Sequence, residues 1–254
     1  MGFVRSGGST ALSLSWPVYQ FGIIDSTNTE AKRRVQAGFY DQWVVASQQS
    51  AGRGRQDRQW LSPVGNIYTT ALFHEPGGLP VALRLPFACA LAVRDVVREH
   101  APAADARLKW PNDVRIDRKK VSGILIETGG SGADFWVAAG MGVNVLVLPD
   151  NVTQPATSLV ELGMPPSMGL DAALLSLRTA FSKRLEQARA GFEGIRQDWL
   201  ASAEGLGETY HIRAGDVAFD GVFEDLGPDG AMVVRLPDGS RRSISAGEVE
   251  IRRS

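Results

Sequence analysis

The sequence predicts a mixed α/β core followed by a small all-β unit. Up to about residue 205, segments with apolar residues three and four apart are interspersed with the short apolar runs typical of strands. Beyond Gly205, short alternating segments follow one another closely, separated by turn signals such as Pro228-Asp229-Gly230. The 254 residues are enough for one large domain and a small one. We therefore expect three parts: a loose N-terminal arm over residues 1–15, an α/β domain over residues 16–205 and a barrel of about five strands over residues 206–254.

The first elements follow from capping and strand signals. Thr27-Asn28-Thr29-Glu30 has the spacing of a capping box, which predicts Thr27 as the N-cap of a helix that runs to about Ala37. Ser26 would then lie in the loop before that helix. Trp43–Ser47 and Ile67–Phe73 are expected to be strands. A helix is expected over Val81–Glu99, broken near Pro86, which suits a first-turn position.

The second part of the core combines short strands with one long helix. The predicted strands are Arg107–Trp110, Val114–Ile116, Val121–Thr128 and Phe135–Val145, with a hairpin turn at Asp117-Arg118-Lys119. Leu174, Leu177, Phe181 and Leu185 share one face of a helix predicted over Leu170–Ala190. Ile195–Leu200 adds one or two further turns. The strands expected in the terminal unit are Tyr210–Arg213, Val217–Leu226, Ala231–Leu236, Ser240–Ser245 and Val249–Ile251.

The composition excludes several classes of protein. A formal net charge of −1 gives no global basic field, which disfavours nucleic-acid binding. The single cysteine, Cys89, rules out an internal disulfide framework and a multi-cysteine zinc site, and its apolar surroundings predict a buried structural thiol. Because no signal peptide or membrane-spanning run is evident, we expect a cytoplasmic protein that binds no membrane.

The strongest local signal is the segment Gln48–Trp60. Gly52, Arg53, Gly54 and Arg55 form a loop whose glycines permit close backbone approach and whose guanidinium groups offer forked donors to phosphate or carboxylate. A solvated basic loop is the alternative interpretation. Trp60 is either a stacking plate for a purine or the first core residue after the loop.

Three further segments carry polar groups or glycines at strand ends. Lys109-Trp110-Pro111-Asn112-Asp113 brings a cation, an amide and a carboxylate together at a strand end, although Asn-Asp is also ordinary turn chemistry. In Lys119–Glu127, alternation predicts one face bearing Lys120, Ser122, Ile124 and Ile126, and Gly123 marks a bulge or a close approach. Gly140–Val145 has glycines at alternate positions, which leave a bare strand face for a flat ring or for close helix packing.

Taken together and in this order, these segments resemble the biotin–protein ligase family. Its motifs stand here as Ser26-Thr27-Asn28, Gly52–Arg55, Lys109–Asp113, Lys120–Leu125 and Gly140–Asn144. The resemblance covers about residues 22 to 145 with specific motifs; beyond them, only the layout of a helix followed by a small barrel agrees. It implies a catalytic domain like that of class II aminoacyl-tRNA synthetases and a C-terminal SH3-like β-barrel.

The resemblance implies a ligase that converts biotin and ATP to biotinyl-5′-AMP and then transfers biotin to a lysine of a biotin carboxyl carrier protein. Arg53, Arg55 and Lys120 would be catalytic, with Mg²⁺ as cofactor and Asp113 as a weaker candidate metal ligand. The implied biotin-binding residues are Ser26, Thr27, Asn28, Gln48, Gly52, Arg53, Gly54, Arg55, Lys120, Gly123 and Gly140. The implied adenylate-binding residues are Trp60, Lys109, Asn112, Asp113, Gly142 and Asn144.

One departure and several alternatives remain. Many relatives continue Arg-Gly-Arg after the Gly-Arg-Gly-Arg loop, whereas this chain has Gln56-Asp57-Arg58, which puts retention of the adenylate in question. The short segment before Ser26 leaves no room for the DNA-binding module of some relatives, so we expect no nucleic-acid partner. Because members of the family are found both as monomers and as dimers, we expect a monomer or weak homodimer. A lipoate–protein ligase, an octanoyltransferase with a nucleophilic cysteine, and a non-catalytic biotin sensor are the competing interpretations.

Overall fold

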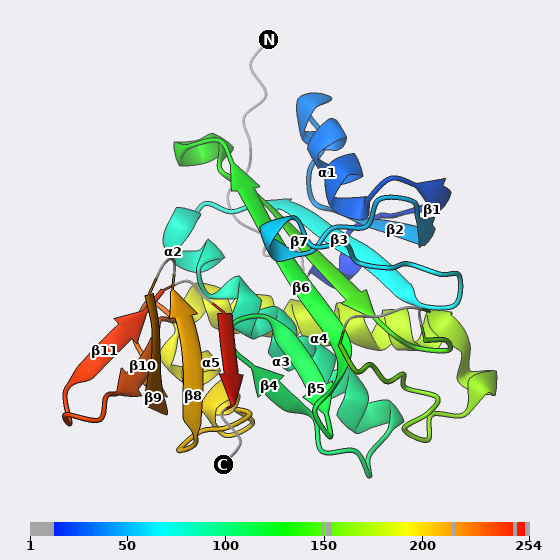
Figure 1. Cartoon of the computed structure of the whole chain (residues 1–254). Coiled ribbons are helices and arrows are strands. Elements are labelled where there is room, and N and C mark those ends of the chain that lie inside the picture. The colour runs from blue at the N-terminus through cyan, green and yellow to red at the C-terminus, as the bar shows by residue number, and fades with distance from the viewer. Residues whose placement is uncertain (1–12, 149, 151–153, 215–216, 246–247, 252–254) are drawn as a thin grey trace.

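Two β-sheets organise the structure, a computed structural model that describes residues 13–148, 150, 154–214, 217–245 and 248–251. The larger sheet has seven strands in the order β1-β2-β3-β7-β6-β5-β4, and the smaller has five in the order β11-β10-β9-β8-β12 (Figure 1). Only the β1–β2 pair of the described ladders is parallel. The predicted α/β core with a terminal all-β unit is therefore confirmed.

The elements of the core agree closely with the sequence pattern. Its strands are β1 (Val18–Ile24), β2 (Gln42–Gln49), β3 (Ile67–His74), β4 (Arg107–Lys109), β5 (Asp113–Ile116), β6 (Lys119–Gly129) and β7 (Trp136–Val143). Its helices are α1 (Thr27–Gln36), α2 (Gly78–Ala82), α3 (Leu85–His100), α4 (Gly169–Ala190) and α5 (Glu193–Leu200). The predicted helix break near Pro86 is confirmed, since α2 ends at Ala82 and Pro86 lies in the first turn of α3. β1 was not predicted, because its exposed positions do not alternate cleanly.

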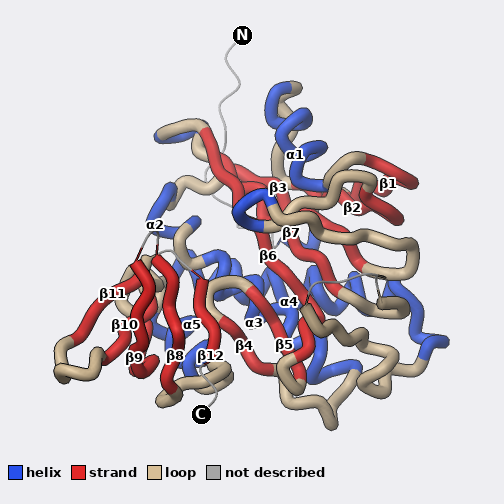
Figure 2. Tube along the Cα trace, in the orientation of Figure 1, coloured by secondary structure: helices blue, strands red, loops and turns tan. Residues whose placement is uncertain are grey.

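Helices cover both faces of the larger sheet. Trp43 and Val44, neighbours on β2, belong to different apolar clusters because successive strand residues point to opposite faces. The Trp43 side packs against α3 and α4 in the main core, and the Val44 side packs against Ala31 of α1. Figure 2 shows α1 standing apart from the α3–α5 layer. The face that carries α1 is left partly open, and the cavity described below lies there.

The start of α1 differs from the predicted capping box. Ser26, not Thr27, is the N-cap residue, and neither end of the expected reciprocal hydrogen-bond pair forms. The Thr27 hydroxyl instead contacts Thr70 at 2.9 Å and Gln49 at 3.3 Å. The Glu30 carboxylate pairs with arginines of its own helix. Tertiary hydrogen bonds thus take the side chains that the local pattern assigns to the cap.

Residues 1–12 of the predicted N-terminal arm lie outside the described residues. Its last three residues form a 3-10 turn, Ser13–Ser15, that packs on the core. The Ser13 hydroxyl lies 2.6 Å from that of Ser182, and its carbonyl accepts a 2.8 Å hydrogen bond from Trp43 Nε1. Residues 13–15 are therefore part of the folded domain, in contrast to the expected arm boundary.

The five-stranded unit is anchored to the core beside the Lys109–Asp113 segment. Its strands are β8 (Thr209–Ala214), β9 (Val217–Leu226), β10 (Met232–Arg235), β11 (Arg241–Ile244) and β12 (Glu248–Ile251). Trp110 Nε1 donates to the Gly230 carbonyl at 3.0 Å, and Arg115 pairs with Glu204 at 3.1 Å. Leu108 also bridges to Ala203, just before the unit begins. These contacts hold the small sheet against the strands that build the cavity.

A buried ion cluster joins the three helices on the closed face. Arg184 of α4 is 4% exposed and donates to Asp95 of α3 at 2.7 and 2.9 Å and to Asp198 of α5 at 2.5 Å. Removing the guanidinium would take the shared partner from both carboxylates, although Asp198 is 46% exposed and Asp95 keeps an ion pair with Arg94.

We expect Arg184→Ala to lower the free energy of unfolding by about 2 kcal/mol, because it removes charge-assisted hydrogen bonds and the packing of a buried side chain. Urea denaturation measures the change. Lys183→Ala, an exposed neighbour on the same helix, should stay within about 0.5 kcal/mol of the parent. Equal losses in the two variants would contradict a specific role for the cluster.

Candidate active site

A cavity of about 710 Å³ lies on the face of the large sheet that carries α1. It is lined by the start of α1, the end of β2, the loop after β2, the β4–β5 turn, β6 and β7, and by Val249 of the small sheet. Most of the predicted site residues meet here: Ser26, Thr27, Asn28, Arg53, Gly54, Arg55, Trp60, Lys109, Asn112, Asp113, Lys120, Gly123, Gly140, Gly142 and Asn144. Segments far apart in the sequence therefore build one site.

One end of the cavity is formed by amides and hydroxyls linked in a continuous hydrogen-bond chain. We call it the polar network and define it as Glu127, Asn28, Thr70, Thr27, Gln49 and Ser62. Asn28 Nδ2 donates to Glu127 at 3.0 Å and to the Leu125 carbonyl at 3.3 Å. Asn28 Oδ1 accepts from the Thr70 hydroxyl at 2.6 Å. These bonds fix the Asn28 amide in one orientation.

Gln49 completes the polar network on the β2 side. Its Oε1 accepts from the Thr27 backbone N–H at 2.9 Å, and its Nε2 donates to Ser62 Oγ at 2.9 Å. Gln48, the residue predicted for this position, does not line the cavity. Side chains alternate along β2, so only one of two adjacent glutamines can face α1. The prediction selected the wrong one of the pair.

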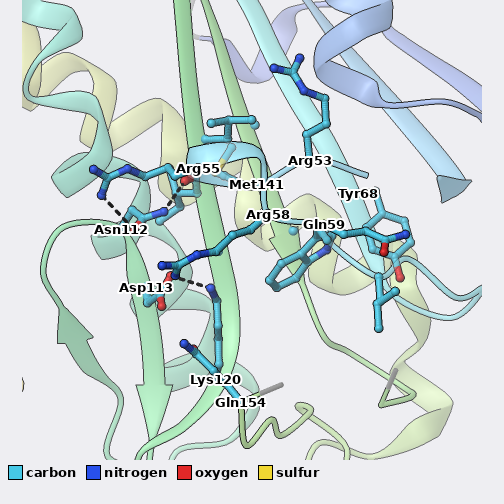
Figure 3. A pocket seen from close by; sticks show the side chains of 18 of the residues that line it. Arg53, Arg55, Arg58, Gln59, Tyr68, Asn112, Asp113, Lys120, Met141 and Gln154 are labelled. Carbon is cyan, nitrogen blue, oxygen red and sulfur yellow. Dashed lines mark hydrogen bonds and ion pairs between the residues drawn. The ribbon is translucent and has the colours of Figure 1, made fainter. Parts of the chain in front are cut away.

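The opposite end of the cavity is basic. Lys120 Nζ lies 2.7 Å from Asp113 Oδ1, and Arg55 approaches Asn112 Oδ1 at 3.5 Å (Figure 3). Asn112 in turn donates to the Ile124 carbonyl at 2.7 Å, which fixes the turn after β4. Burial lowers the pKa of the Arg55 guanidinium, and the Asp113 charge opposes that shift. Two cations thus converge on one carboxylate and one amide, a setting suited to binding anions.

A β-bulge places Lys120 in this cluster. Val114 pairs with Ser122 and Arg115 pairs with Lys120, so β6 has one extra residue, Val121, opposite β5. Simple alternation puts Lys120 on the face of Ile124, which lies in the main core. The bulge reverses the alternation, and Lys120 joins the cavity face with Gly123. The prediction that Lys120 shares a face with Ile124 is therefore wrong, because the extra residue turns Lys120 to the cavity face.

Arg53 lies apart from Lys120 and Arg55, which we call the basic cluster. Its Nη1 is 3.3 Å from Glu127 Oε1, at the end of the cavity formed by the polar network, and Figure 3 shows it pointing away from Lys120. Burial raises the pKa of the Glu127 carboxyl, but hydrogen bonds from Lys32 and Asn28 and the charge of Arg53 outweigh it, so the pKa lies below its usual value. The two arginines of the Gly-Arg-Gly-Arg loop therefore face different ends of the cavity.

The glycines of β6 and β7 make room for side chains of the protein itself. A Cβ at Gly142 would lie 2.5 Å from Trp60 Nε1, and one at Gly123 would lie 3.0 Å from the same indole. A Cβ at Gly140 would lie 2.2 Å from Asn28 Oδ1. The bare strand face that we expected for a flat ring or for close packing is thus covered by Trp60 and Asn28, which both line the cavity.

Gly52 and Asn144 have structural contacts of their own. Gly52 does not line the cavity. A Cβ there would lie 2.3 Å from the Trp60 carbonyl, where the two ends of the segment Gly52–Trp60, which we call the arginine loop, meet. Asn144 Nδ2 donates to the Thr157 carbonyl at 3.2 Å, while its Oδ1 is buried without a protein partner. Asn144 Oδ1 is therefore an unsatisfied acceptor in the wall of the cavity. The side chain of Asp57, the departure noted above, is outside the described set.

Several residues near the site carry no sequence signal. Tyr68, Gln154 and Val249 line the cavity, and Thr70 lies behind it in the polar network. Each is an ordinary strand or loop residue in its own segment, so only the tertiary fold brings it here. Among the described residues, no three side chains of His, Cys, Asp or Glu gather to form a metal site. None of the described helices is long and apolar enough to cross a membrane.

Cys89 is fully buried in α3, and burial raises the pKa of its thiol far above the usual range. A thiolate is the reactive form, so this cysteine is unsuited to nucleophilic catalysis. We expect no labelling by a maleimide in the native protein and one label per chain in denaturant, measured by mass spectrometry. Rapid native labelling would revive the octanoyltransferase interpretation.

Comparisons with known proteins agree with this geometry. Residues 21–144 match the Biotin/lipoate A/B protein ligase family, and residues 205–252 match the Biotin protein ligase C terminal domain. The chain is 39% identical to the biotin–(acetyl-CoA-carboxylase) ligase of Paracoccus denitrificans, over 89% of this chain and 96% of the relative. The biotin protein ligase of Aquifex aeolicus, solved with biotin and ATP, is similar with a TM-score of 0.76 and 29% identity, over 94% of this chain and 99% of that one. That of Leishmania major, solved with biotinyl-5-AMP, has a TM-score of 0.63 and 25% identity, over 91% and 99%.

Proposed function

The chain belongs to the Biotin/lipoate A/B protein ligase family, and from that premise we propose how its cavity performs the reaction. The enzyme activates biotin with ATP to biotinyl-5′-AMP and transfers biotin to a lysine of a carrier protein. We assign biotin to the end of the cavity formed by the polar network and the nucleotide to the end formed by Trp60, Lys109, Asn112, Gly142 and Asn144. We place the chemistry in the α/β domain, proposed over residues 16–205, and assign the C-terminal unit, proposed over residues 206–254, as the barrel.

The observation that carries this assignment is the polarity of two amides. Gln49 Oε1 accepts the Thr27 backbone N–H, and Nε2 gives one hydrogen to Ser62, so Nε2 has a second hydrogen to offer the cavity. Asn28 uses both amide hydrogens within the protein and can offer only the second lone pair of Oδ1. One donor and one acceptor therefore face the same end of the cavity.

A cyclic urea complements this pair. The ureido ring of biotin has a carbonyl that accepts and two N–H groups that donate, and a buried site must match them because an unpaired buried amide costs about 1–3 kcal/mol. The dithiolane ring of lipoate offers neither group, so it would leave the Asn28 and Gln49 amides without partners. This difference favours biotin over lipoate, and Ser26, Thr27 and the loop residues Arg53 and Gly54 complete the biotin end.

The first step brings two anions together. The biotin carboxylate attacks the α-phosphorus of ATP, and pyrophosphate leaves. Lys120 and Arg55, which converge at the basic end of the cavity, stabilise the added negative charge in the transition state, and Asp113 positions the Lys120 ammonium. Gly123 allows the Lys120 chain to lie along β6, since a Cβ there would be 3.3 Å from Nζ.

Mg²⁺ is the cofactor that we propose; Asp113 would help to hold it, and it would supply positive charge to the phosphates of ATP. Magnesium is usually held by one or two carboxylates together with substrate phosphates, and Asp113 supplies a carboxylate oxygen beyond the one paired with Lys120. The site therefore fits a nucleotide-borne ion better than a dedicated protein cage.

In the second step, the carrier's lysine amine attacks the mixed anhydride, forming the amide and releasing AMP. The arginine loop covers the middle of the cavity and is positioned to exclude water, which would hydrolyse the adenylate. The carrier is a biotin carboxyl carrier protein of the acetyl-CoA carboxylase type. We propose a cytoplasmic enzyme that is a monomer or weak homodimer, without a nucleic-acid or membrane partner.

Biotin-dependent exchange of labelled pyrophosphate into ATP tests this function. We expect exchange with biotin, none with lipoate, and loss of exchange when EDTA removes Mg²⁺. Exchange with lipoate would place the chain in the sister branch of the family. Tight biotin binding without exchange would indicate a sensor in place of an enzyme.

A further inference from the structure

We propose, building on the biotin site above, that Glu127 and Ser62 are positioning residues that set the polarity of the two ligand-facing amides. Neither side chain lines the cavity. Each lies directly behind an amide that does: Glu127 behind Asn28, and Ser62 behind Gln49. They would determine recognition of the ureido ring without touching it.

Glu127 collects three donors from two separate segments. Its carboxylate accepts from Lys32 Nζ at 2.5 Å and Asn28 Nδ2 at 3.0 Å, both on α1, and pairs with Arg53 Nη1 at 3.3 Å. The side chain is 15% exposed, so these protein donors supply most of its solvation. A carboxylate is the only side chain of this size that accepts all three bonds without presenting a hydrogen of its own.

This arrangement allows the Asn28 amide only one orientation. Turning the amide over would place Oδ1 against the Leu125 carbonyl and against the Glu127 carboxylate, which are both acceptors. With glutamine at position 127, its oxygen would stay against Lys32 and Arg53, which contact Oε1, and its NH₂ would take the place of Oε2 and face Asn28. The turned amide would then gain a partner, and the acceptor that Asn28 offers the cavity would no longer be fixed.

Ser62 fixes Gln49 in the same way. Its hydroxyl donates to the Trp60 carbonyl at 2.9 Å, and a carbonyl can only accept. With its one proton committed, Ser62 can only accept from Gln49, so Nε2 must lie on that side. The Thr27 backbone N–H requires Oε1 on the other side. Two backbone groups, one at each end, thereby define the donor that Gln49 presents.

Both positioning residues also contact the arginine loop. Glu127 holds Arg53 near its beginning, and Ser62 holds the Trp60 carbonyl at its end. The ends of the loop that covers the adenylate are therefore tied to the amides that recognise the ring.

Steady-state pyrophosphate exchange with Glu127→Gln and Ser62→Ala tests the proposal. We expect the KM for biotin to rise about tenfold to a hundredfold in each variant, because a buried amide loses its fixed partner. The KM for ATP and the kcat at saturating biotin should change less than about twofold, since the basic cluster is untouched. A merely structural role would not separate the two substrates in this way.

Glu30→Gln and Ser50→Ala are the matched controls. Glu30 pairs with arginines on the outer side of α1, and Ser50 is exposed at the end of β2. Neither should change the KM for biotin. The proposal is overturned if the KM values for biotin and ATP rise together, if the KM for biotin is unchanged in both variants, or if both variants fail to fold by circular dichroism. Absence of exchange in the parent enzyme would instead refute the proposed function itself.

Discussion

Replacing Lys120 with alanine is expected to lower biotin-dependent pyrophosphate exchange by about 100- to 1000-fold, the usual cost of removing one charge-stabilising donor from a transition state. Lys120 Nζ lies at the basic end of the cavity, 2.7 Å from Asp113 and 5.3 Å from the centroid of the Trp60 ring. It is the cation best placed to contact both the biotin carboxylate and the α-phosphate. Its removal should therefore act on kcat, with smaller changes in the KM of each substrate.

Lys119→Ala is the matched control for this experiment. Lys119 is the adjacent lysine, exposed at the start of β6 and paired in register with Ile116. Its loss should leave exchange within about twofold of the parent, since exposed surface substitutions have small effects. If Lys120→Ala keeps more than about a tenth of the parent rate, the charge must come mainly from Arg55, and the assigned role of Lys120 is wrong.

The bulge in β6 shows why the site could be predicted only in part from the sequence. The Lys-x-x-Gly-Ile-Leu motif identified Lys120 by resemblance, but alternation assigned it to the core face of Ile124. Register along a strand is set by pairing with β5, and the extra residue at Val121 has no local sequence marker. The residue was therefore found by its motif, while its orientation required the tertiary structure.

The polar network marks a second limit. Asn28 and Gln49 lie in segments that the sequence singles out, yet choosing between Gln48 and Gln49 depended on the strand phase. Thr70, Ser62 and Glu127 lie in β3, in the segment after the arginine loop and in β6, and each is unremarkable in its own segment. Their roles follow from hydrogen bonds across 13 to 99 positions of sequence, which no short pattern encodes.

Regular elements were easier to predict, because their signals are local. Apolar periodicity gave α4 within one residue, and the turn at Asp117 and Arg118 is confirmed by positive φ values of 49° and 64°. β1 was missed for the opposite reason. It is an edge strand with exposed Tyr19 and Ile23, and only its pairing with β2 makes it a strand.

Gly140→Ala and Gly142→Ala are expected to impair different substrates, although the two glycines are only two positions apart on β7. A methyl group at Gly140 would lie 2.2 Å from Asn28 Oδ1 and must displace the acceptor assigned to the ureido ring. A methyl group at Gly142 would lie 2.5 Å from Trp60 Nε1 and must displace the Trp60 indole, which we expect to stack on adenine. Overpacking of this kind costs about 1–3 kcal/mol, which corresponds to about tenfold to a hundredfold in affinity.

The measurement is the KM for each substrate in pyrophosphate exchange. Gly140→Ala should raise mainly the KM for biotin, and Gly142→Ala mainly the KM for ATP. Gly22→Ala on β1 is the control, because a Cβ there meets nothing within 4 Å. If the two variants raise the same KM, the division of the cavity into a biotin end and a nucleotide end does not hold. If each variant raises the KM of a different substrate, the two substrates are assigned to opposite ends of the cavity. The comparison is well matched, because both glycines lie on one face of one strand and gain the same single methyl group.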